Sequence, residues 1–503
     1  MCSIGGVIPM KTVDPDEVMK LVAILGGDLQ HRGHEWLGFA HSDGRILRVY
    51  KQAGLFESAF GNREVYQSLR ADTPQLMCLQ GRFSTQGRST KRNAQPQFLR
   101  PGRGTIALGS NGDHRHYAEA RRELEEQGLV FDSQNDAELL VQHILYHADN
   151  NFDRLEDGIR HLMLHSSASF SSWLATRDTV HLFRDRFANR PLFYMTVGDY
   201  FVFASEDCAL NGILTYRAEE GHQDGTVSIN QVLPGEMLTV HLHDPQIVRQ
   251  QLVEPEERRA LCLFEYVYFQ RPDSRFRVPT DGNPLCYKIM VQWDNGNYWF
   301  DYLEDQTEEV NSFRYRLGKQ LAAEHPMGDA DADCVISIPA SGDLAAAGFA
   351  DESGLAYRIG LVRNPYVSRT FISPELSNRK HLASIKYRPM HALFTKRPRI
   401  VVVDDSIVYG TSIQRLVRTL RAAGAKEIHV RISCPPVVER CPYGIDMATK
   451  GDLIAATMAI EKIEREHLRV SSLRYLSLEG LLKVAGKDAR HFCTGCWSKE
   501  LRI

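Results

Sequence analysis

Two adjacent carboxylates mark the most informative stretch of the chain. Residues 400–415 (IVVVDDSIVYGTSIQR) contain an apolar run that ends in Asp404 and Asp405, a short loop, and then Gly410, Thr411 and Ser412 at a predicted helix start. A glycine lets the backbone approach an anion, and the hydroxyls and N–H groups at a helix N-terminus suit a phosphate. The carboxylates can hold ribose hydroxyls or Mg²⁺. An acidic metal pocket of another kind would also begin with such an Asp pair.

A second reactive group stands near the start of the chain. Cys2 follows Met1 directly. If Met1 is removed, the α-amino group of Cys2, with a pKa of about 8, becomes a general base beside its own thiol. By itself, this position favours the interpretation of Cys2 as an ordinary small residue. The pair Asn111 and Gly112 alone suggests a turn, and Arg82 alone suggests a surface ion pair.

Near the other end, Cys493 and Cys496 form a C-x-x-C motif. This motif is compatible with half of a zinc site or with two buried thiols, and its spacing to the other cysteines does not distinguish them. The chain has ten cysteines in 503 residues. We therefore expect free thiols, metal ligands or a nucleophile in a reducing compartment.

Composition excludes several classes of protein. The chain carries 60 Lys and Arg against 63 Asp and Glu, a formal net charge of −3, which does not match a general nucleic-acid binder. No apolar run approaches the roughly 18 residues of a membrane span, and no charged-then-apolar leader follows Met1. We expect a cytoplasmic protein of two or three domains that binds neither nucleic acid nor membrane.

Two patterns of predicted elements must position these groups. Up to about residue 250, short alternating apolar runs with turn residues predict antiparallel sheets, interrupted by amphipathic helices near residues 15–29, 118–127 and 137–147. From about residue 310, apolar strands alternate with helices, including those at 344–351 and 413–423, which predicts a doubly wound parallel α/β unit. Gly424 is expected to end the second of these helices.

The N-terminal half resembles the glutaminase domain of class II, or N-terminal nucleophile, amidotransferases. The matching strings are MCSIGGVIP, HRGHEWLGFA, GRFSTQG, NAQPQF, GSNGD and NDAELL. The resemblance implies a sandwich of antiparallel sheets between helices, with Cys2 as nucleophile and Asn111 and Gly112 as the oxyanion hole. It further implies that Arg82 and Asp136 hold the carboxylate and ammonium groups of glutamine.

Residues 400–415 resemble the phosphoribosyl pyrophosphate (PRPP) motif of type I phosphoribosyltransferases, in which four apolar residues precede two acidic residues, four variable residues, Gly and two Thr or Ser. The resemblance assigns Ser341, Asp404 and Asp405 to a Mg²⁺–PRPP site. It assigns Ser406, Gly410, Thr411 and Ser412 to the phosphate loop. It places Arg363, Arg369 and Lys386 on a segment that closes over PRPP, although each also fits a solvated surface charge.

The amidophosphoribosyltransferases combine both halves, and most of the chain resembles this family. Further matching strings are CLFEYVYFQRPDS, LVRNPYVSRTFISP and CPYGIDMATKGDLIA. The resemblance implies that ammonia cut from glutamine passes internally to PRPP and displaces pyrophosphate, giving 5-phosphoribosylamine in the first step of purine synthesis. We expect a glutaminase domain at residues 2–250, a connecting segment at 251–310 and a phosphoribosyltransferase domain at 311–503, assembled as a homo-oligomer.

One branch of this family carries a [4Fe–4S] cluster on four cysteines. The corresponding positions are occupied here by Cys262, Cys441, Cys493 and Cys496. The resemblance therefore favours the cluster over zinc, with a role in folding and stability, because the implied reaction is not redox.

Several positions depart from the family pattern. In the PRPP half, Tyr409, Ala340 and Arg363 replace a usual Arg, an acidic residue and Lys. In the glutaminase half the unusual residues are His34, Trp36, Phe83, Ser110 and Asp113. Residues 277–310 form an insertion without a family counterpart. Two alternatives stay open: a paralogue that aminates a different phosphorylated sugar, and a PRPP-sensing regulator without catalysis. Retention of Cys2 argues against the regulator.

Overall fold

The computed structural model describes residues 2–71, 74–84, 87–100, 104–242, 246–276, 286–294, 297–303, 307–364, 386–445, 447 and 450–501. Arg369 lies outside these residues. Within the described part of the chain, no helix is long and apolar enough to cross a membrane.

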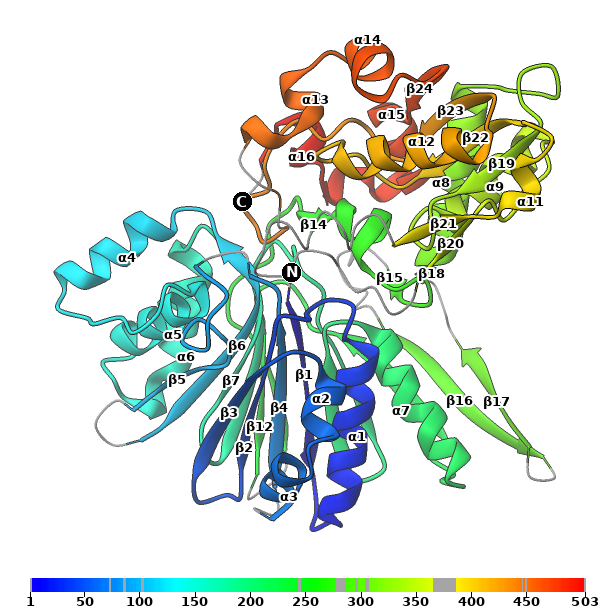
Figure 1. The fold of residues 1–503 in the computed structure, drawn as a ribbon. Helices are drawn as coiled ribbons and strands as arrows, with labels where there is room; N and C mark the ends of the chain where they lie inside the picture. The colour runs from blue at the N-terminus through cyan, green and yellow to red at the C-terminus, as the bar shows by residue number, and fades with distance from the viewer. Residues whose placement is uncertain are drawn as a thin grey trace.

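The N-terminal half consists of two stacked sheets with helices outside each of them (Figure 1). The first sheet has nine strands in the order β17 (Asn297–Leu303), β16 (Cys286–Asp294), β11 (Thr226–Gln231), β9 (Phe193–Val197), β10 (Tyr200–Ala204), β1 (Ser3–Pro9), β4 (Leu76–Arg82), β2 (Trp36–Ser42) and β3 (Leu47–Ala53). The second has six, in the order β13 (Ile247–Gln251), β12 (Glu236–His241), β8 (Thr179–Arg184), β7 (Ala168–Ala175), β6 (Ile106–His114) and β5 (Gln97–Leu99). All strand pairs in both sheets are antiparallel, as predicted.

The alternation of side chains along β1 explains the layering. Ile4 and Ile8 point into the core between the two sheets, whereas Val7 points into the core beneath the helices. The helices of this half are α1 (Pro15–Asp28), α2 (Phe56–Phe60), α3 (Arg63–Ala71), α4 (Tyr117–Glu126), α5 (Asp136–His147), α6 (Leu155–His165) and α7 (Asp207–Glu219). Residues of α1 and α7 pack on the nine-stranded sheet, and residues of α5 and α6 pack on the six-stranded sheet. The three helices expected here are thus confirmed as α1, α4 and α5.

Part of the predicted insertion extends the nine-stranded sheet. Strands β16 and β17 form a hairpin, and β16 pairs with β11 at the sheet edge. Its Tyr287 is fully buried and donates a 2.6 Å hydrogen bond to Asp207 at the start of α7. Residues 286–294 and 297–303, expected in a connecting segment, are therefore anchored on the N-terminal half.

The C-terminal half is built on a parallel sheet. Its strands lie in the order β19 (Cys334–Ser337), β22 (Arg399–Asp404), β23 (Glu427–Ile432) and β24 (Ser472–Tyr475). Its helices are α8 (Val310–Glu324), α9 (Asp343–Ser353), α11 (His391–Phe394), α12 (Thr411–Ala423), α13 (Ile454–Thr457), α14 (Ile460–Lys462), α15 (Leu478–Ala485) and α16 (Gly495–Ser498). Helix α12 ends where Gly424 adopts a φ of +126°, which confirms that prediction.

Short strand pairs complete the described part of this half. Strand β20 (Leu361–Arg363) pairs with β21 (Tyr387–Pro389), and β15 (Arg275–Phe276) pairs with β18 (Glu308–Glu309). Strand β14 (Leu261–Cys262) runs parallel to β25 (Phe492–Cys493), so the end of the chain lies against the join between the halves.

Candidate active sites

Cys2 is buried and immediately precedes β1. Its thiol donates to the carbonyl oxygen of Phe83 at 3.7 Å, and its backbone N–H donates to Oδ1 of Asn111 at 3.4 Å. Burial raises the pKa of the Cys2 thiol, and the nearby Arg82 partly opposes this shift. A base close to the sulfur is therefore needed before the thiol can act as a nucleophile.

The predicted oxyanion hole lies on β6. Asn111 is fully buried, and its Nδ2 has no hydrogen-bond partner among the described residues. A buried N–H donor without a partner is costly unless a ligand completes it. Gly112 has no room for a side chain, because a Cβ there would lie 1.8 Å from the carbonyl oxygen of Ser169 on β7. The strand thus keeps a free amide donor beside Cys2.

A buried cation and a buried carboxylate accompany them. Arg82 ends β4, and Asp136 is the first residue of α5, whose N-cap Asn135 accepts from the N–H of Ala137 at 2.9 Å. Burial raises the pKa of Asp136, and the charge of Arg82 opposes this shift. Both groups also act electrostatically on Cys2. The structure therefore brings together Cys2, Arg82, Asn111 and Asp136.

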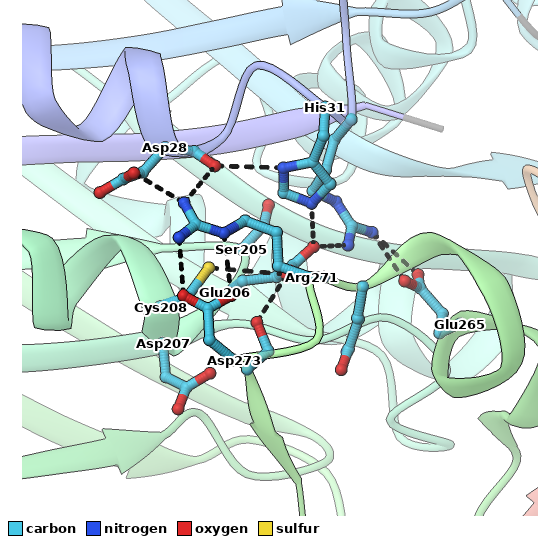
Figure 2. Close-up of polar contacts among 12 residues, drawn as sticks. Asp28, His31, Ser205, Glu206, Asp207, Cys208, Glu265, Arg271 and Asp273 are labelled. Atoms are coloured by element: carbon cyan, nitrogen blue, oxygen red, sulfur yellow. Dashed lines mark hydrogen bonds and ion pairs between the residues drawn. The ribbon is translucent and has the colours of Figure 1, made fainter. Parts of the chain in front are cut away.

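Sequence reasoning missed a buried network behind Cys2. Nε of Arg32 donates to the carbonyl oxygen of Cys2 at 3.2 Å, and the same guanidinium binds Glu206 and, at 2.9 and 3.0 Å, both oxygens of Glu265. Figure 2 shows Glu206 and Glu265 in this network, with His31 bonded to Glu206 at 2.7 Å. Burial alone would raise the pKa of Glu206, but His31 and Arg32 hold it well below its ordinary value.

The network continues into the second half of the molecule. Arg190 donates to Glu265 at 3.1 Å and, at 3.1 and 2.5 Å, to the carbonyl oxygen of Tyr443. The neighbouring Gly444 lies so close to β6 that a Cβ there would come within 2.7 Å of the carbonyl oxygen of Gly112. Arg32 and Glu265 belong to the strings HRGHEW and FEYVYF, but neither string signals that the two side chains meet.

Two of the unusual residues, His34 and Phe83, contact each other next to Cys2. The ring of His34 packs against Phe83 with centroids 5.3 Å apart, and Phe83 provides the carbonyl that accepts from Cys2. Trp36 Nε1 donates to Ser89 at 3.2 Å, and Ser110 accepts from Ser172 on the neighbouring strand at 2.9 Å. Of these residues, Phe83 contacts Cys2 directly, and Cys2 and Asn111 still lie together.

At the second site, Asp404 and Asp405 lie at the carboxyl end of β22. Oδ1 of Asp404 accepts from Ser341 Oγ at 3.4 Å and from the N–H of Asp405 at 3.0 Å, and Ser406 donates to Asp405 at 2.5 Å. Burial, together with the charge of Asp405, raises the pKa of Asp404 well above its ordinary value. This set of carboxylate and hydroxyl oxygens has the donor chemistry that Mg²⁺ prefers.

The predicted phosphate loop has the expected geometry. Gly410 has a φ of +77° and caps α12, and Thr411 and Ser412 form the exposed first turn. A side chain at Gly410 would lie 2.5 Å from Ile454 and 3.0 Å from His467, so only glycine fits. The N-terminus of α12 thus faces solvent beside the two aspartates.

Of the three residues predicted to close over PRPP, the two described ones, Arg363 and Lys386, lie near the same site. Arg363 pairs with Tyr387 across β20 and β21, and Nζ of Lys386 lies 5.0 Å from the Tyr387 ring centroid. Burial raises the pKa of Tyr387, the charge of Asp404 adds to the shift, and Arg363 opposes it. The charges of Arg363 and Asp404 therefore both act on the Tyr387 hydroxyl.

The four predicted cluster cysteines converge from three segments. Cys262 is paired in register with Cys493, and the carbonyl oxygen of Cys496 accepts from the N–H groups of Val438 and Glu439 at 2.9 and 3.1 Å. The N–H of Tyr443 donates to the sulfur of Cys441 at 3.4 Å. Burial raises the pKa of Cys262 to about 12, with further contributions from Cys441 and Cys493, while Arg190 opposes the shift.

Comparison with known proteins gives one result for the whole chain. Residues 81–212 match the model of a glutamine amidotransferase domain. The amidophosphoribosyltransferase of Methanocaldococcus jannaschii is 36% identical over 99% of this chain and 96% of its own length, and that of Synechocystis is 35% identical over 97% and 89%. The solved glutamine PRPP amidotransferase from Bacillus subtilis, complexed with ADP and GMP, matches with a TM-score of 0.79 and 30% identity over 99% of this chain and 97% of that one.

Fold and sites together define an amidotransferase in which an N-terminal nucleophile glutaminase is joined to a phosphoribosyltransferase. The chain belongs to the amidophosphoribosyltransferase family, which confirms the predicted family, fold class and type of enzyme.

Proposed function

We propose that this enzyme catalyses the glutamine-dependent amination of PRPP to 5-phosphoribosylamine, the first step of de novo purine synthesis. The observation that carries the proposal is the convergence of Cys2, Arg82, Asn111 and Asp136 from four separate segments of one half. The aspartate pair and phosphate loop of the other half supply a second site for an anionic sugar.

In the first site, the Cys2 thiol attacks the side-chain amide of glutamine, and its α-amine, once Met1 is removed, accepts the thiol proton. The N–H groups of Asn111 and Gly112 stabilise the oxyanion. The α-ammonium group then returns this proton to the leaving nitrogen, so collapse expels ammonia and leaves a thioester, which water hydrolyses to glutamate and the free thiol. Arg82 and Asp136 bind the carboxylate and ammonium groups of glutamine, because their charges are opposite to these groups.

In the second site, Asp404 and Asp405 bind ribose hydroxyls and, together with Ser341, provide oxygen ligands for Mg²⁺. Ser406 and residues 410–412 bind the 5-phosphate at the start of α12. Mg²⁺ supplies charge stabilisation for the departing pyrophosphate. Arg363 and Lys386, with Arg369 outside the described residues, cover the bound PRPP while ammonia attacks C1.

We further propose that Cys262, Cys441, Cys493 and Cys496 bind a [4Fe–4S] cluster. Thiolates on one zinc ion lie about 3.8 Å apart, given Zn–S bonds of about 2.3 Å. In the described part of the chain, no three of these sulfurs lie within 4.8 Å of one another. The family resemblance therefore carries the choice of a cluster, in which each thiolate binds a different iron. Arg190 supplies positive charge next to the thiolates.

The decisive experiment incubates anaerobically purified protein with glutamine, Mg²⁺ and PRPP, and follows glutamate and pyrophosphate together. Equal release of both supports the proposal. The double variant D404N/D405N should release no pyrophosphate and should show no PRPP binding when measured by calorimetry. Turnover with another phosphorylated sugar but not PRPP would favour the paralogue, to which Tyr409 and Ala340 point, and PRPP binding without turnover would favour the regulator.

A cytoplasmic location and a homo-oligomeric state stay part of the proposal. The described free cysteines, at positions 2, 78, 208, 262, 334, 434, 441, 493 and 496, suit a reducing compartment. Size measurement of the purified protein by light scattering tests the oligomeric state.

A further inference from the structure

Four histidines meet on the outer face of the glutaminase half, away from the cluster cysteines and the aspartate pair. His143 and His147 lie one turn apart on α5, and His161 and His165 lie one turn apart on α6. Residues four apart share one face of a helix, so each helix presents a pair of imidazoles. Figure 1 shows α5 and α6 side by side.

Packing of the two helices brings these imidazoles into contact. Nε2 of His143 lies 3.0 Å from Nδ1 of His161, and the rings of His147 and His161 stack with centroids 3.4 Å apart. One ring nitrogen from each of these three residues lies within 4.8 Å of the others. His165 is exposed and stands 4.3 Å from His161 between ring centroids.

The backbone holds this arrangement rigidly. Gly158 on α6 lies so close to α5 that a Cβ there would come within 2.1 Å of the carbonyl oxygen of Ile144. Beneath the histidines, Ile144 and Leu140 of α5 pack with Ile159 and Leu162 of α6 in one core. The helices therefore keep a fixed separation, as a preorganised metal site requires.

The protonation state also suits metal binding. Burial, followed by the charges of the neighbouring histidines, lowers the pKa of His143 to about 3. Burial likewise lowers the pKa of His147 and His161, although Asp149 partly opposes the shift at His147. Burial and the neighbouring imidazoles therefore favour the neutral form of these three rings, and each neutral imidazole offers one lone pair.

We propose that His143, His147 and His161 bind a divalent transition-metal ion of the zinc class, with His165 as a fourth ligand at the exposed rim. Imidazole ligands select Zn²⁺, Cu²⁺ or Ni²⁺ over Mg²⁺ and Ca²⁺, which prefer oxygen. Nitrogens on one tetrahedral zinc ion lie about 3.3 Å apart, given Zn–N bonds of about 2.0 Å. The observed 3.0 Å contact is close to this spacing. The ion would clamp α5 to α6.

The test uses the full chain with its cysteines loaded, so that thiolates do not compete for the probe. Zn²⁺ is titrated against a chromophoric chelator at pH 7.5, with wild-type protein and the double variant H147Q/H161Q. Wild-type protein should bind one equivalent of zinc beyond the metal already held by its cysteines. The double variant should bind this additional zinc at least about 100-fold more weakly. Zinc should also raise the melting temperature of wild-type protein but not of the variant.

The matched control is H222Q/H391Q, which removes two exposed histidines elsewhere and should keep the extra equivalent. The single variant H161Q, with circular dichroism to verify folding, gives a second measurement if the double variant is unstable. In difference spectra against the cobalt-free protein, Co²⁺ in the same site should add visible d–d bands without thiolate charge transfer. Equal zinc affinity in wild type, H147Q/H161Q and H161Q would overturn the proposal, as would thiolate bands with Co²⁺. The histidines would then only stack and hydrogen-bond between the two helices.

Discussion

At Asn111 the fold maintains a feature that a stable protein core normally avoids. The amide nitrogen is buried and has no partner among the described residues, while its own oxygen accepts from the N–H of Cys2. The oxygen therefore fixes the orientation of the amide, so Nδ2 remains the donor that a ligand can use. This arrangement costs stability in the free protein and suits an anion that forms only during reaction.

Replacement of Cys2 by Ala should abolish glutamine-dependent turnover and leave the reaction with added ammonium salts within about two-fold of wild type. The reason is that the second site lies on other elements and needs only ammonia. Glutamate and pyrophosphate release measure the two outcomes. The control C78A changes a buried thiol on β4 away from the site. Loss of both activities in folded C2A protein would contradict the two-site scheme.

Replacement of Asn111 by Ala should lower kcat for glutamine hydrolysis by about 10²–10³-fold, the usual effect of losing one oxyanion donor. KM for glutamine should change much less, because Arg82 and Asp136 still bind the substrate ends. Steady-state glutaminase kinetics provide the test, with N230A on β11 as control. A change confined to KM would assign Asn111 to substrate binding instead.

At the scale of elements, the hairpin of β16 and β17 shows what the sequence could not reveal. Its aromatic residues and turns indicate ordered structure, but no local pattern specifies that β16 pairs with β11, whose paired residues lie 56–64 positions earlier in the chain. By contrast, helices α1 and α12 follow from local signals: Asp14 caps α1 before Pro15, and Gly410 and Gly424 flank α12.

The same contrast holds for the sites. Asp404, Asp405 and residues 410–412 are one continuous string, so the sequence predicts their proximity. Arg32 and Glu265 are 233 residues apart and form their ion pair only in the folded chain. The cysteine quartet was predictable through the family resemblance, since its spacing along the chain carries no geometric information.

The hairpin makes a pH-dependent contact with α7. Burial raises the pKa of Asp207 to about 7, although the Tyr287 hydroxyl opposes the shift. In the unfolded chain this carboxyl has an ordinary pKa of about 4. Between pH 4 and pH 7 the folded state therefore keeps a proton on Asp207 that the unfolded chain has lost. This contribution to stability is full below pH 4 and is lost as pH rises through 7.

We expect the stability of D207N to depend less on pH than that of wild type. The difference in stability between wild type and variant should change by up to about 1.4 kcal/mol per pH unit between pH 4 and 7. Calorimetric melting at several pH values measures it, and D294N, an exposed change on the same hairpin, should follow wild type. Parallel pH profiles for wild type and D207N would refute the assignment.

At the scale of the whole molecule, Glu265 connects the two halves. It binds Arg32, which holds the Cys2 carbonyl, and Arg190, which holds the Tyr443 carbonyl. All three side chains are buried, and removal of one charge from such a group typically costs about 3–5 kcal/mol. A substitution at Glu265 is therefore expected to affect Cys2 as well.

The variant E265Q should melt at lower temperature and hydrolyse glutamine more slowly than wild type, because both arginines lose a charged partner. Calorimetry and glutaminase assays measure the two effects. E256Q removes a partly exposed partner of Arg186 at 3.2 Å and should cost at most about 1 kcal/mol. Equal melting temperatures for E265Q and E256Q would show that the network contributes no more than a surface pair.

The cysteine quartet connects segments that are far apart in the chain. Cys262 lies at the join, Cys493 and Cys496 lie near the end, and Cys441 lies two residues before Tyr443. A cluster on these thiolates would crosslink the join to the C-terminal strand β25 and, through Arg190, to the network behind Cys2. Its main effect would be on folding, as for a structural metal.

Anaerobically purified wild-type protein should accordingly be brown, with iron and sulfide in near-equal amounts and sensitivity to oxygen. C496S should lose most of the iron and sulfide. It should also have a lower soluble yield and a lower melting temperature, whereas the kcat of the surviving enzyme should change little. The control C434S alters a buried thiol in the same core, where a serine hydroxyl can still donate to the Pro435 carbonyl. Colourless protein with stoichiometric zinc would overturn the cluster in favour of zinc, and stable protein without either metal would leave the four cysteines as buried thiols.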